Sequence, residues 1–259
     1  LDLSDTNQYS KLPKGCKKIL HLAGQSSGEI SYHEPIIDLS KNTITTLNLI
    51  KYGLDNHSER LIYASSMSVY GDVTLYDTGV REDDNLCPKS CYGISKLSSE
   101  NYLNVFKDKL PYISMRMFNV YGPGQRSDSA YSAVIPIFIK RMKKKLPVVI
   151  NGGFQTRDFI YVQDAIEGLM YVLENGKSCR PYNIATGCDV SVRELAKLVT
   201  DEFDYNPEIK FDHSKPSMIP IRRVSVERIR KELGWSSKVN ISAGIKKTCD
   251  WYKRNIMDS

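Results

Sequence analysis

Leu61-Ile-Tyr-Ala64, a short apolar run that ends at Ser65 and Ser66, begins the stretch that decides the fold of this chain. The amphipathic segment Tyr92–Phe106 follows and is predicted to be a helix, and Tyr112-Ile-Ser-Met-Arg-Met117 is predicted to be the next strand. Apolar strands on each side of an amphipathic helix are typical of a parallel sheet whose two faces are both covered by helices.

The same alternation is found upstream, where Ile19-Leu-His-Leu-Ala23 is predicted to be a strand and Ile37–Tyr52 a helix. Ligands of such sheets bind beyond the carboxyl ends of the strands. The segment Leu22-Ala23-Gly24 and the residues Ser66 and Asn119 fall at three successive strand ends. We therefore expect the functional site at this edge of the sheet.

Tyr92 and Lys96 form a candidate pair for proton transfer. They are four positions apart, so on a helix their side chains share one face. An ammonium group beside a phenol favours the phenolate, and it is expected to lower the pKa of Tyr92. With the hydroxyl of Ser66 nearby, the pair can move a proton on and off a sugar or alcohol oxygen. The hydride that the other half of such a redox reaction needs implies a nicotinamide cofactor.

Four further motifs follow in order: Arg116-Met-Phe-Asn119-Val-Tyr-Gly-Pro-Gly-Gln125, Arg157-Asp-Phe-Ile-Tyr-Val-Gln-Asp164, Tyr182-Asn-Ile-Ala-Thr-Gly187 and Glu232-Leu-Gly-Trp235. Together with the serine, tyrosine and lysine above, this ordered set resembles the extended short-chain dehydrogenase/reductase family, specifically its nucleotide-sugar epimerases and dehydratases. The resemblance runs from Leu1 to about Tyr252.

The resemblance implies an α/β fold, a Rossmann-type doubly wound parallel sheet with a smaller α/β substrate-binding lobe. Residues 1–120 and about 158–187 are expected to form the dinucleotide-binding domain, and about 121–157 and 188–259 the substrate-binding lobe. The family's glycine-rich turn after its first strand is absent, and Leu1-Asp2-Leu3 resembles the segment after its third strand. We therefore expect this chain to be part of a longer protein that includes the first three strands.

The chain after Gly122 alternates less regularly than the part before it. Ser191-Val-Arg-Glu194 is a capping box, which predicts a helix that runs towards Phe203. The segment Phe159–Ala185 is predicted to return to the main sheet.

The resemblance also assigns roles to residues of this chain. Ser66, Tyr92 and Lys96 are expected to be catalytic. The expected cofactor is NAD, in contact with Asp2, Leu3, Leu22, Ala23, Gly24, Asn42, Ser65, Tyr92, Lys96 and Phe118. The expected substrate is a UDP-sugar or another nucleotide sugar, in contact with Ser66, Asn119, Val134, Arg157 and Arg222. Guanidinium groups suit the geometry of a diphosphate, although an ion pair with Asp158 or Asp164 is the alternative for Arg157.

Met67 and Ser68 stand where the family's dehydratases carry Asp-Glu, and neither side chain is a useful acid or base. Elimination of water is therefore disfavoured, and the pattern resembles that of 4-epimerases, which oxidise C4 transiently to a 4-keto sugar with bound NAD. A nucleotide-4-keto-sugar reductase or epimerase-reductase that uses NAD(P)H is the first alternative, supported by Asp212-His-Ser-Lys-Pro216, which resembles a segment of GDP-fucose synthases. A non-catalytic nucleotide-sugar-binding relative is the second. The chain departs from the family's Asn-x-x-Gly-Thr pattern, which begins here at Asn42, by having Thr45 in place of glycine.

The composition is that of an ordinary globular chain, with 41% hydrophobic and 25% charged residues. No apolar run approaches the ~18 residues of a membrane-spanning helix, and the six cysteines and four histidines show no metal-binding spacing. We therefore expect reduced thiols, no metal, no membrane partner and a cytoplasmic location. The net charge of +6 suits anionic ligands. The basic run Lys140–Lys145 is expected to be the solvated end of a helix that begins near Tyr131, not a nucleic-acid site.

A homodimer is expected because relatives pair the helices that correspond here to Leu47–Tyr52 and Leu97–Phe106. The second of these helices has more apolar side chains than one sheet face needs: Leu97, Tyr102, Leu103 and Phe106.

Overall fold

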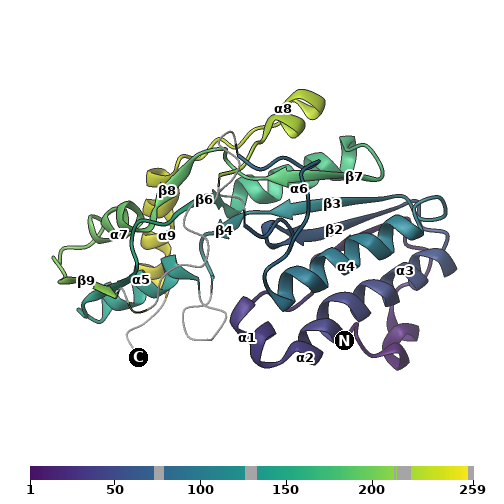
Figure 1. Ribbon diagram of the computed structural model, residues 1–259, viewed down its shortest axis with the longest axis horizontal. Coiled ribbons are helices and arrows are strands. Elements are labelled where there is room, and N and C mark those ends of the chain that lie inside the picture. The colour runs from purple at the N-terminus through teal and green to yellow at the C-terminus, as the bar shows by residue number, and fades with distance from the viewer. Residues whose placement is uncertain (73–78, 126–132, 213, 215–222, 256–259) are drawn as a thin grey trace.

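The computed structural model describes residues 1–72, 79–125, 133–212, 214 and 223–255. Tyr131 and Arg222, which the sequence singled out, therefore lie outside the described residues. The same holds for His213, Lys215 and Pro216 of the segment that supports the reductase alternative. Figure 1 shows a sheet flanked by helices, with a second group of short strands and helices beside it.

Four parallel strands form the main sheet, in the order β1 (Lys18–His21), β2 (Arg60–Ser66), β3 (Tyr112–Met117) and β7 (Arg180–Ile184). The first strand is two residues shorter at its carboxyl end than predicted. β2 leads directly into a short 3-10 turn, η3 (Met67–Val69). The expected parallel sheet is confirmed, and within the described residues β1 is its edge strand.

Helices cover both faces of the main sheet: α3 (Thr45–Asp55) and α4 (Cys91–Val105) on one side, and α6 (Val162–Asn175) and α8 (Glu227–Leu233) on the other (Figure 1). Leu61 and Tyr63 of β2 are fully buried in the core beneath α3 and α4, whereas Ile62 is fully buried in the core with α6. Successive side chains of a strand point to opposite faces. The unbroken apolar run of β2 is therefore explained by a sheet with two covered faces, as predicted.

The helix predicted over Ile37–Tyr52 is longer than expected and contains a π-helical turn. It consists of α2 (Pro35–Leu39), the π turn η2 (Ser40–Ile44) and α3. Thr45 follows the π turn and donates a hydrogen bond from its hydroxyl to the Ser40 carbonyl, at 3.3 Å. Two short elements before this helix were not predicted, η1 (Thr6–Lys11) and α1 (Gly28–His33).

The second group of elements contains two small sheets. One is formed by β4 (Asn119–Tyr121), β6 (Thr156–Tyr161) and β8 (Asp189–Ser191), and the other by β5 (Val148–Asn151) and β9 (Ile209–Asp212). Their helices are α5 (Val134–Lys143), α7 (Val192–Thr200) and α9 (Ile241–Asn255), which pack around a separate apolar core (Figure 1).

Two predictions for this part of the chain have different outcomes. Ser191 caps α7 as predicted, because its hydroxyl accepts a hydrogen bond from the Glu194 backbone N–H at 3.1 Å. The prediction for Phe159–Ala185 is only half right. β7 joins the main sheet, but β6 pairs with β4 and β8 instead.

All six cysteines have free thiols. In the described parts of the chain, no helix is long and apolar enough to span a membrane. The same residues include no group of three or more His, Cys, Asp or Glu side chains placed to hold a metal ion.

Candidate active site

Ser66, Tyr92 and Lys96 lie together where β2 ends and α4 begins. Ser66 is the last residue of β2, and Ser90 caps α4 by accepting a hydrogen bond from the Gly93 N–H at 3.1 Å, which fixes the first turn of the helix. The Ser66 side chain lies close enough to Tyr92 to lower the pKa of its phenol. Lys96 Nζ lies 5.7 Å from the centre of the Tyr92 ring. The strand end and the i,i+4 spacing thus bring the three predicted residues to one place.

Lys96 is held under this cluster with little access to water. Lys96 is only 5% exposed, and its Nζ donates a hydrogen bond to the Ala64 carbonyl at 2.9 Å. Burial lowers the pKa of Lys96 to about 8, while the negative charges of Asp38 and Glu100 act in the opposite direction. The ammonium group can therefore lose its proton at a far lower pH than an exposed lysine.

The pKa of Tyr92 differs from the expectation. Burial raises it, the nearby Ser66 side chain lowers it, and the negative charge of Asp38 raises it, so that the net direction is upward. The predicted lowering by Lys96 is wrong for this reason: removal of the phenol from water has the larger effect.

Gly24, Asn42 and Ser65, three of the residues expected to contact the cofactor, adjoin Lys96 or Ser66. A Cβ atom at Gly24 would lie 2.5 Å from Asn42 Oδ1 and 3.5 Å from Lys96 Nζ, so a side chain there would force Asn42 to shift. Asn42 Oδ1 and Ser65 Oγ are buried and have no hydrogen-bond partner among the described residues. A site with no room for a side chain and with two buried polar atoms that need partners fits a polar cofactor such as NAD.

The other expected cofactor residues are more dispersed. Leu22 and Ala23 are exposed between β1 and Gly24. Asp2 pairs with Lys41, next to Asn42, and the Leu3 carbonyl accepts a hydrogen bond from Asn48 Nδ2 at 2.8 Å, so the first residues lie against η2 and α3. Phe118 is 1% exposed and packs in the core on the α6 side of the sheet.

Three of the expected substrate residues line one cavity. Asn119, Val134 and Arg157 come from β4, α5 and β6, and the cavity between these elements and β5 has a volume of about 470 Å³. Asn119 Nδ2 donates to the Asp158 carbonyl at 2.6 Å, which fixes its amide at the wall. Arg222, the fourth, lies outside the described residues, and Ser66 belongs to the cluster described above.

The two carboxylates that were considered as partners of Arg157 are occupied by other groups. Asp158 accepts hydrogen bonds from the backbone N–H groups of Thr186 (2.9 Å) and Gly187 (2.7 Å). Asp164 accepts hydrogen bonds from the backbone N–H groups of Lys238 and Val239, at 2.9 and 2.8 Å. Burial lowers the pKa of Arg157. Arg157 is partly buried, and its Nη1 donates a hydrogen bond to the Thr156 carbonyl at 2.6 Å. A guanidinium on a cavity wall is suited to an anionic ligand.

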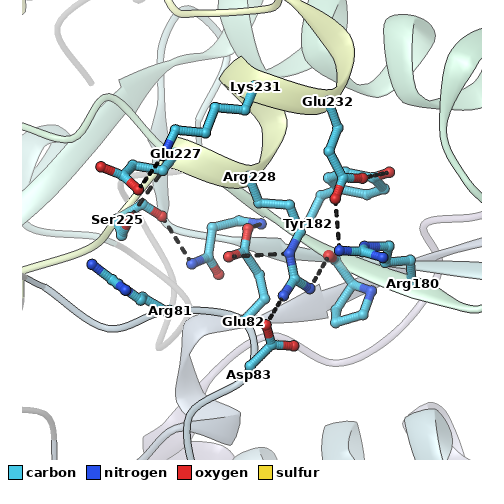
Figure 2. A network of polar contacts seen from close by, with 12 residues as sticks. Arg81, Glu82, Asp83, Arg180, Tyr182, Ser225, Glu227, Arg228, Lys231 and Glu232 are labelled. Carbon is cyan, nitrogen blue, oxygen red and sulfur yellow. Dashed lines mark hydrogen bonds and ion pairs between the residues drawn. The ribbon is translucent and has the colours of Figure 1, made fainter.

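Two other motifs of the sequence meet in a network of polar contacts beside β7 (Figure 2). Tyr182 donates a hydrogen bond to Glu232 Oε2 at 3.0 Å, and Arg180 forms an ion pair with the same side chain at 2.7 Å. Arg228 of α8 pairs with Glu82 at 3.7 Å. These contacts hold α8 and the segment around Glu82 on the sheet. Tyr182 and Glu232 therefore stabilise the packing of these elements.

Asp38 is a residue near the site that sequence reasoning missed. It is fully buried, and it accepts a hydrogen bond from Asn42 Nδ2 at 2.9 Å and one from Ser95 Oγ at 2.6 Å. The i,i+4 spacing of Asp38 and Asn42 on a predicted helix is the sequence feature that could have indicated their contact.

Comparisons with known proteins agree with this geometry. The family described as "NAD dependent epimerase/dehydratase family" matches residues 1–185. A putative UDP-glucose 4-epimerase of Methanocaldococcus jannaschii is 31% identical over 260 residues, which cover 98% of this chain and 83% of the relative. The dTDP-4-dehydro-6-deoxyglucose reductase of Escherichia coli is 32% identical over 89% of this chain and 73% of its own length.

A solved structure extends the likeness to three dimensions. The UDP-glucose 4-epimerase of Thermus thermophilus, in complex with NAD, superimposes with a TM-score of 0.88 at 28% identity, over 99% of this chain and 84% of that one. The Rossmann-type fold expected from the sequence is thereby confirmed. Because the family match spans most of the chain and Ser66, Tyr92 and Lys96 are assembled in the structure, we conclude that this protein belongs to the NAD-dependent epimerase/dehydratase family of enzymes.

Proposed function

We propose that this protein is a nucleotide-sugar 4-epimerase, which oxidises C4 of its substrate transiently to a 4-keto sugar. The observation that carries the proposal is the cluster of Ser66, Tyr92 and Lys96 without a carboxylic acid directly after Ser66. Met67 and Ser68 form the η3 turn instead, and the Ser66 hydroxyl donates to the Ser68 hydroxyl at 3.3 Å. Loss of water from a sugar needs an acid for the leaving hydroxyl and a base for the ring proton. A proton-transfer pair alone suffices for oxidation and reduction at one carbon.

Each residue of the cluster has a distinct role in this proposal. Gly24, Asn42 and Ser65 would hold NAD, which when bound would supply the hydride chemistry for oxidation and reduction at C4. Tyr92 accepts the proton of the C4 hydroxyl as the C4–H bond breaks, and it gives the proton back when the carbonyl is reduced. Ser66 hydrogen-bonds the same oxygen. The positive charge of Lys96 stabilises the phenolate of Tyr92, which offsets part of the effect of burial on that group.

The cavity lined by Asn119, Val134 and Arg157 is the proposed site of the nucleotide. A guanidinium group forms paired hydrogen bonds with phosphate oxygens, so Arg157 is assigned to the diphosphate, together with Arg222.

The proposed division of the chain into a cofactor domain and a substrate lobe follows from this assignment. Residues 1–120 and about 158–187 form the cofactor domain, and about 121–157 and 188–259 form the substrate lobe. The UDP in the names of the two epimerases above supports a UDP-sugar as the substrate.

A 4-keto-sugar reductase is the second candidate, and the 32% identity with the E. coli reductase favours it. The same three residues serve such a reaction, in which Tyr92 gives a proton to the C4 oxygen. The difference is that the hydride then comes from NAD(P)H that is consumed and replaced at each turnover. Dependence on an added reductant therefore separates the two candidates.

We also propose that the protein is a cytoplasmic homodimer. Its six free cysteines suit a reducing compartment. The outer surfaces of η2 and α4 expose Ile44 (37%), Ile94 (53%) and Val105 (74%), and α3 and α4 lie side by side in Figure 1. Leu103, one of the apolar residues of the helix expected at the dimer interface, is buried in the core instead. Sedimentation that shows only monomer at micromolar concentration would exclude the dimer.

The proposed reaction is tested by incubating the protein with UDP-glucose or UDP-N-acetylglucosamine, with and without NADPH, and following the configuration at C4 by NMR. Inversion at C4 without NADPH is expected. Reduction of a 4-keto sugar that proceeds only with NADPH would support the reductase, and binding of UDP-sugars without any conversion would support a non-catalytic relative.

A further inference from the structure

Asp38 is a buried carboxylate against the turn of α4 that carries Tyr92 and Lys96. It lies in α2, one turn before Asn42 of the π turn, and it is 0% exposed. A buried ionised group is costly unless hydrogen bonds and an opposite charge compensate for the loss of water. The surroundings of Asp38 supply both.

Three hydrogen bonds to Asp38 come from three different segments of the site. Oδ1 accepts from Gln25 Nε2 at 2.8 Å and from Asn42 Nδ2 at 2.9 Å, and Oδ2 accepts from Ser95 Oγ at 2.6 Å. Gln25 directly follows Gly24 beyond the end of β1, and Ser95 directly precedes Lys96 in α4. One carboxylate thus connects the strand end, the π turn and the helix that carries the catalytic pair.

Burial raises the pKa of Asp38, and its uncharged hydrogen-bond donors and the positive charge of Lys96 act in the opposite direction. Five groups face Lys96: Asp38 from α2, Glu100 and Tyr92 from α4, His21 from β1 and Tyr63 from β2. Burial lowers the pKa of His21 to about 3, and burial raises the pKa of Tyr63, so both are neutral near neutral pH.

Glu100 is already neutralised by a different partner. Its two carboxylate oxygens accept hydrogen bonds from Arg116 Nε and Nη2, at 3.2 and 2.8 Å. A bidentate pair of this kind satisfies the carboxylate fully. Of the two acidic groups that face Lys96, Asp38 is therefore the one whose charge is left to balance the ammonium group.

We propose that Asp38 is a positioning residue of the active site, whose carboxylate holds Asn42 and Ser95 in place and whose negative charge keeps Lys96 protonated beside Tyr92. This role rests on the proposed function, in which Tyr92 exchanges the proton and Lys96 supports it. Because Lys96 Nζ lies 5.7 Å from the centre of the Tyr92 ring, loss of a proton from either group should act on the other, and two titration steps are expected of the pair. Removal of a nearby negative charge lowers both apparent pKa values, whichever group loses its proton first.

Asp38→Asn tests the charge separately from the hydrogen bonds. The asparagine oxygen can still accept from Gln25 and Asn42, and its amide can donate to Ser95, because a hydroxyl group accepts as well as donates. The measurement is a pH titration of the NAD-loaded protein with 13Cζ-labelled tyrosine, in which the Tyr92 signal is identified by its loss in Tyr92→Phe. This readout needs no substrate and no turnover.

The expected result is that both titration steps of the Tyr92 signal move to lower pH in Asp38→Asn. The acid and alkaline limbs of the pH–rate profile with UDP-glucose should move in the same direction. If the alkaline limb moves by one pH unit, the rate at a fixed pH on that limb falls about tenfold. One control should titrate as the wild type does. Asp55→Asn removes an exposed carboxylate at the end of α3, far along the chain from Asp38.

Unshifted titration steps in Asp38→Asn, with or without a lower melting temperature, would overturn the proposal and leave Asp38 a purely structural residue. If that variant does not fold, Asp38→Ser, which is smaller and also neutral, must show the shift, and its absence there overturns the proposal equally. A shift in a protein that converts no UDP-sugar would support the role of Asp38 and contradict the proposed function.

Discussion

Tyr92 is the residue on which the proposed chemistry depends most directly. Its ring centre lies 5.7 Å from Lys96 Nζ, and the nearby Ser66 side chain lowers the pKa of its phenol. Tyr92→Phe deletes one oxygen and leaves the packing of the ring unchanged. Turnover should fall by roughly 10²–10⁴-fold, as expected for the loss of a general acid–base group. Calorimetry should show unchanged affinity for UDP, and a variant that keeps more than about a tenth of the wild-type rate would contradict the assignment.

Arg157 tests the assignment of the cavity to the nucleotide. Loss of one charge-assisted hydrogen bond to phosphate costs about 1.5–3 kcal/mol, so Arg157→Ala should raise the KM for a UDP-sugar by about tenfold or more. The NAD content should stay unchanged, because the proposed cofactor residues lie elsewhere. Lys144→Ala, which removes an exposed positive charge after α5, is the matched control. Unaltered affinity for UDP in calorimetry, or loss of NAD, would show that Arg157 has a structural role.

At the residue scale, the sequence predicts those parts of the site that depend on local geometry alone. Tyr92 and Lys96 are one helical turn apart, and Ser66 ends a strand, so their meeting follows from the period of a helix and the edge of a sheet. The partners of Asp38 depend on how α2 packs against α4, and no local pattern specifies that packing. The direction of the Tyr92 pKa was mispredicted because burial is also set by tertiary packing.

At the scale of elements, the end of β1 allows a sharp test of the cofactor site. Gly24→Ala would place a Cβ atom 2.5 Å from Asn42 Oδ1, a distance that forces the asparagine or the backbone to move. The shift displaces Asn42 from its expected contact with the cofactor, and loss of one hydrogen bond costs about 1.5 kcal/mol, so we expect about tenfold weaker NAD binding. Gly28→Ala in α1 is the control, because no heavy atom lies within 4 Å of its added Cβ. Equal NAD affinity of the two variants would exclude Gly24 from the cofactor site.

The main sheet was more predictable than the smaller ones for a physical reason. β2 is buried on both faces, so its continuous apolar run marks it as a central strand of a parallel sheet. β4 and β8 have only three residues each, and three residues do not show which strand will be their partner. The pairing of β6 with these two strands therefore appeared only in the structure. The π turn η2 likewise leaves no distinct pattern in an amphipathic sequence.

At the scale of the whole molecule, a buried ion pair connects the layers around β3. Arg116 pairs with Glu100 of α4 at 2.8 Å, and its guanidinium also donates to the Tyr70 hydroxyl at 3.0 Å and to the Glu82 carbonyl at 2.9 Å. Glu100→Ala leaves the buried cation without its partner, which typically costs about 3–5 kcal/mol of unfolding free energy. Asp55→Ala breaks the exposed pair with Lys51 and should cost less than about 1 kcal/mol. Urea denaturation of both variants is the measurement, and similar losses would contradict the importance of the buried pair.

Transient oxidation at C4 is tested most directly by isotope transfer. The protein is incubated with UDP-glucose and, separately, with UDP-N-acetylglucosamine, each deuterated at C4, in ordinary water without added NADPH. Because the hydride that leaves C4 is the one that returns, we predict products inverted at C4 that keep their deuterium. Products that carry hydrogen from water at C4, or conversion that occurs only when NADPH is supplied and consumed, would contradict the proposed 4-epimerase.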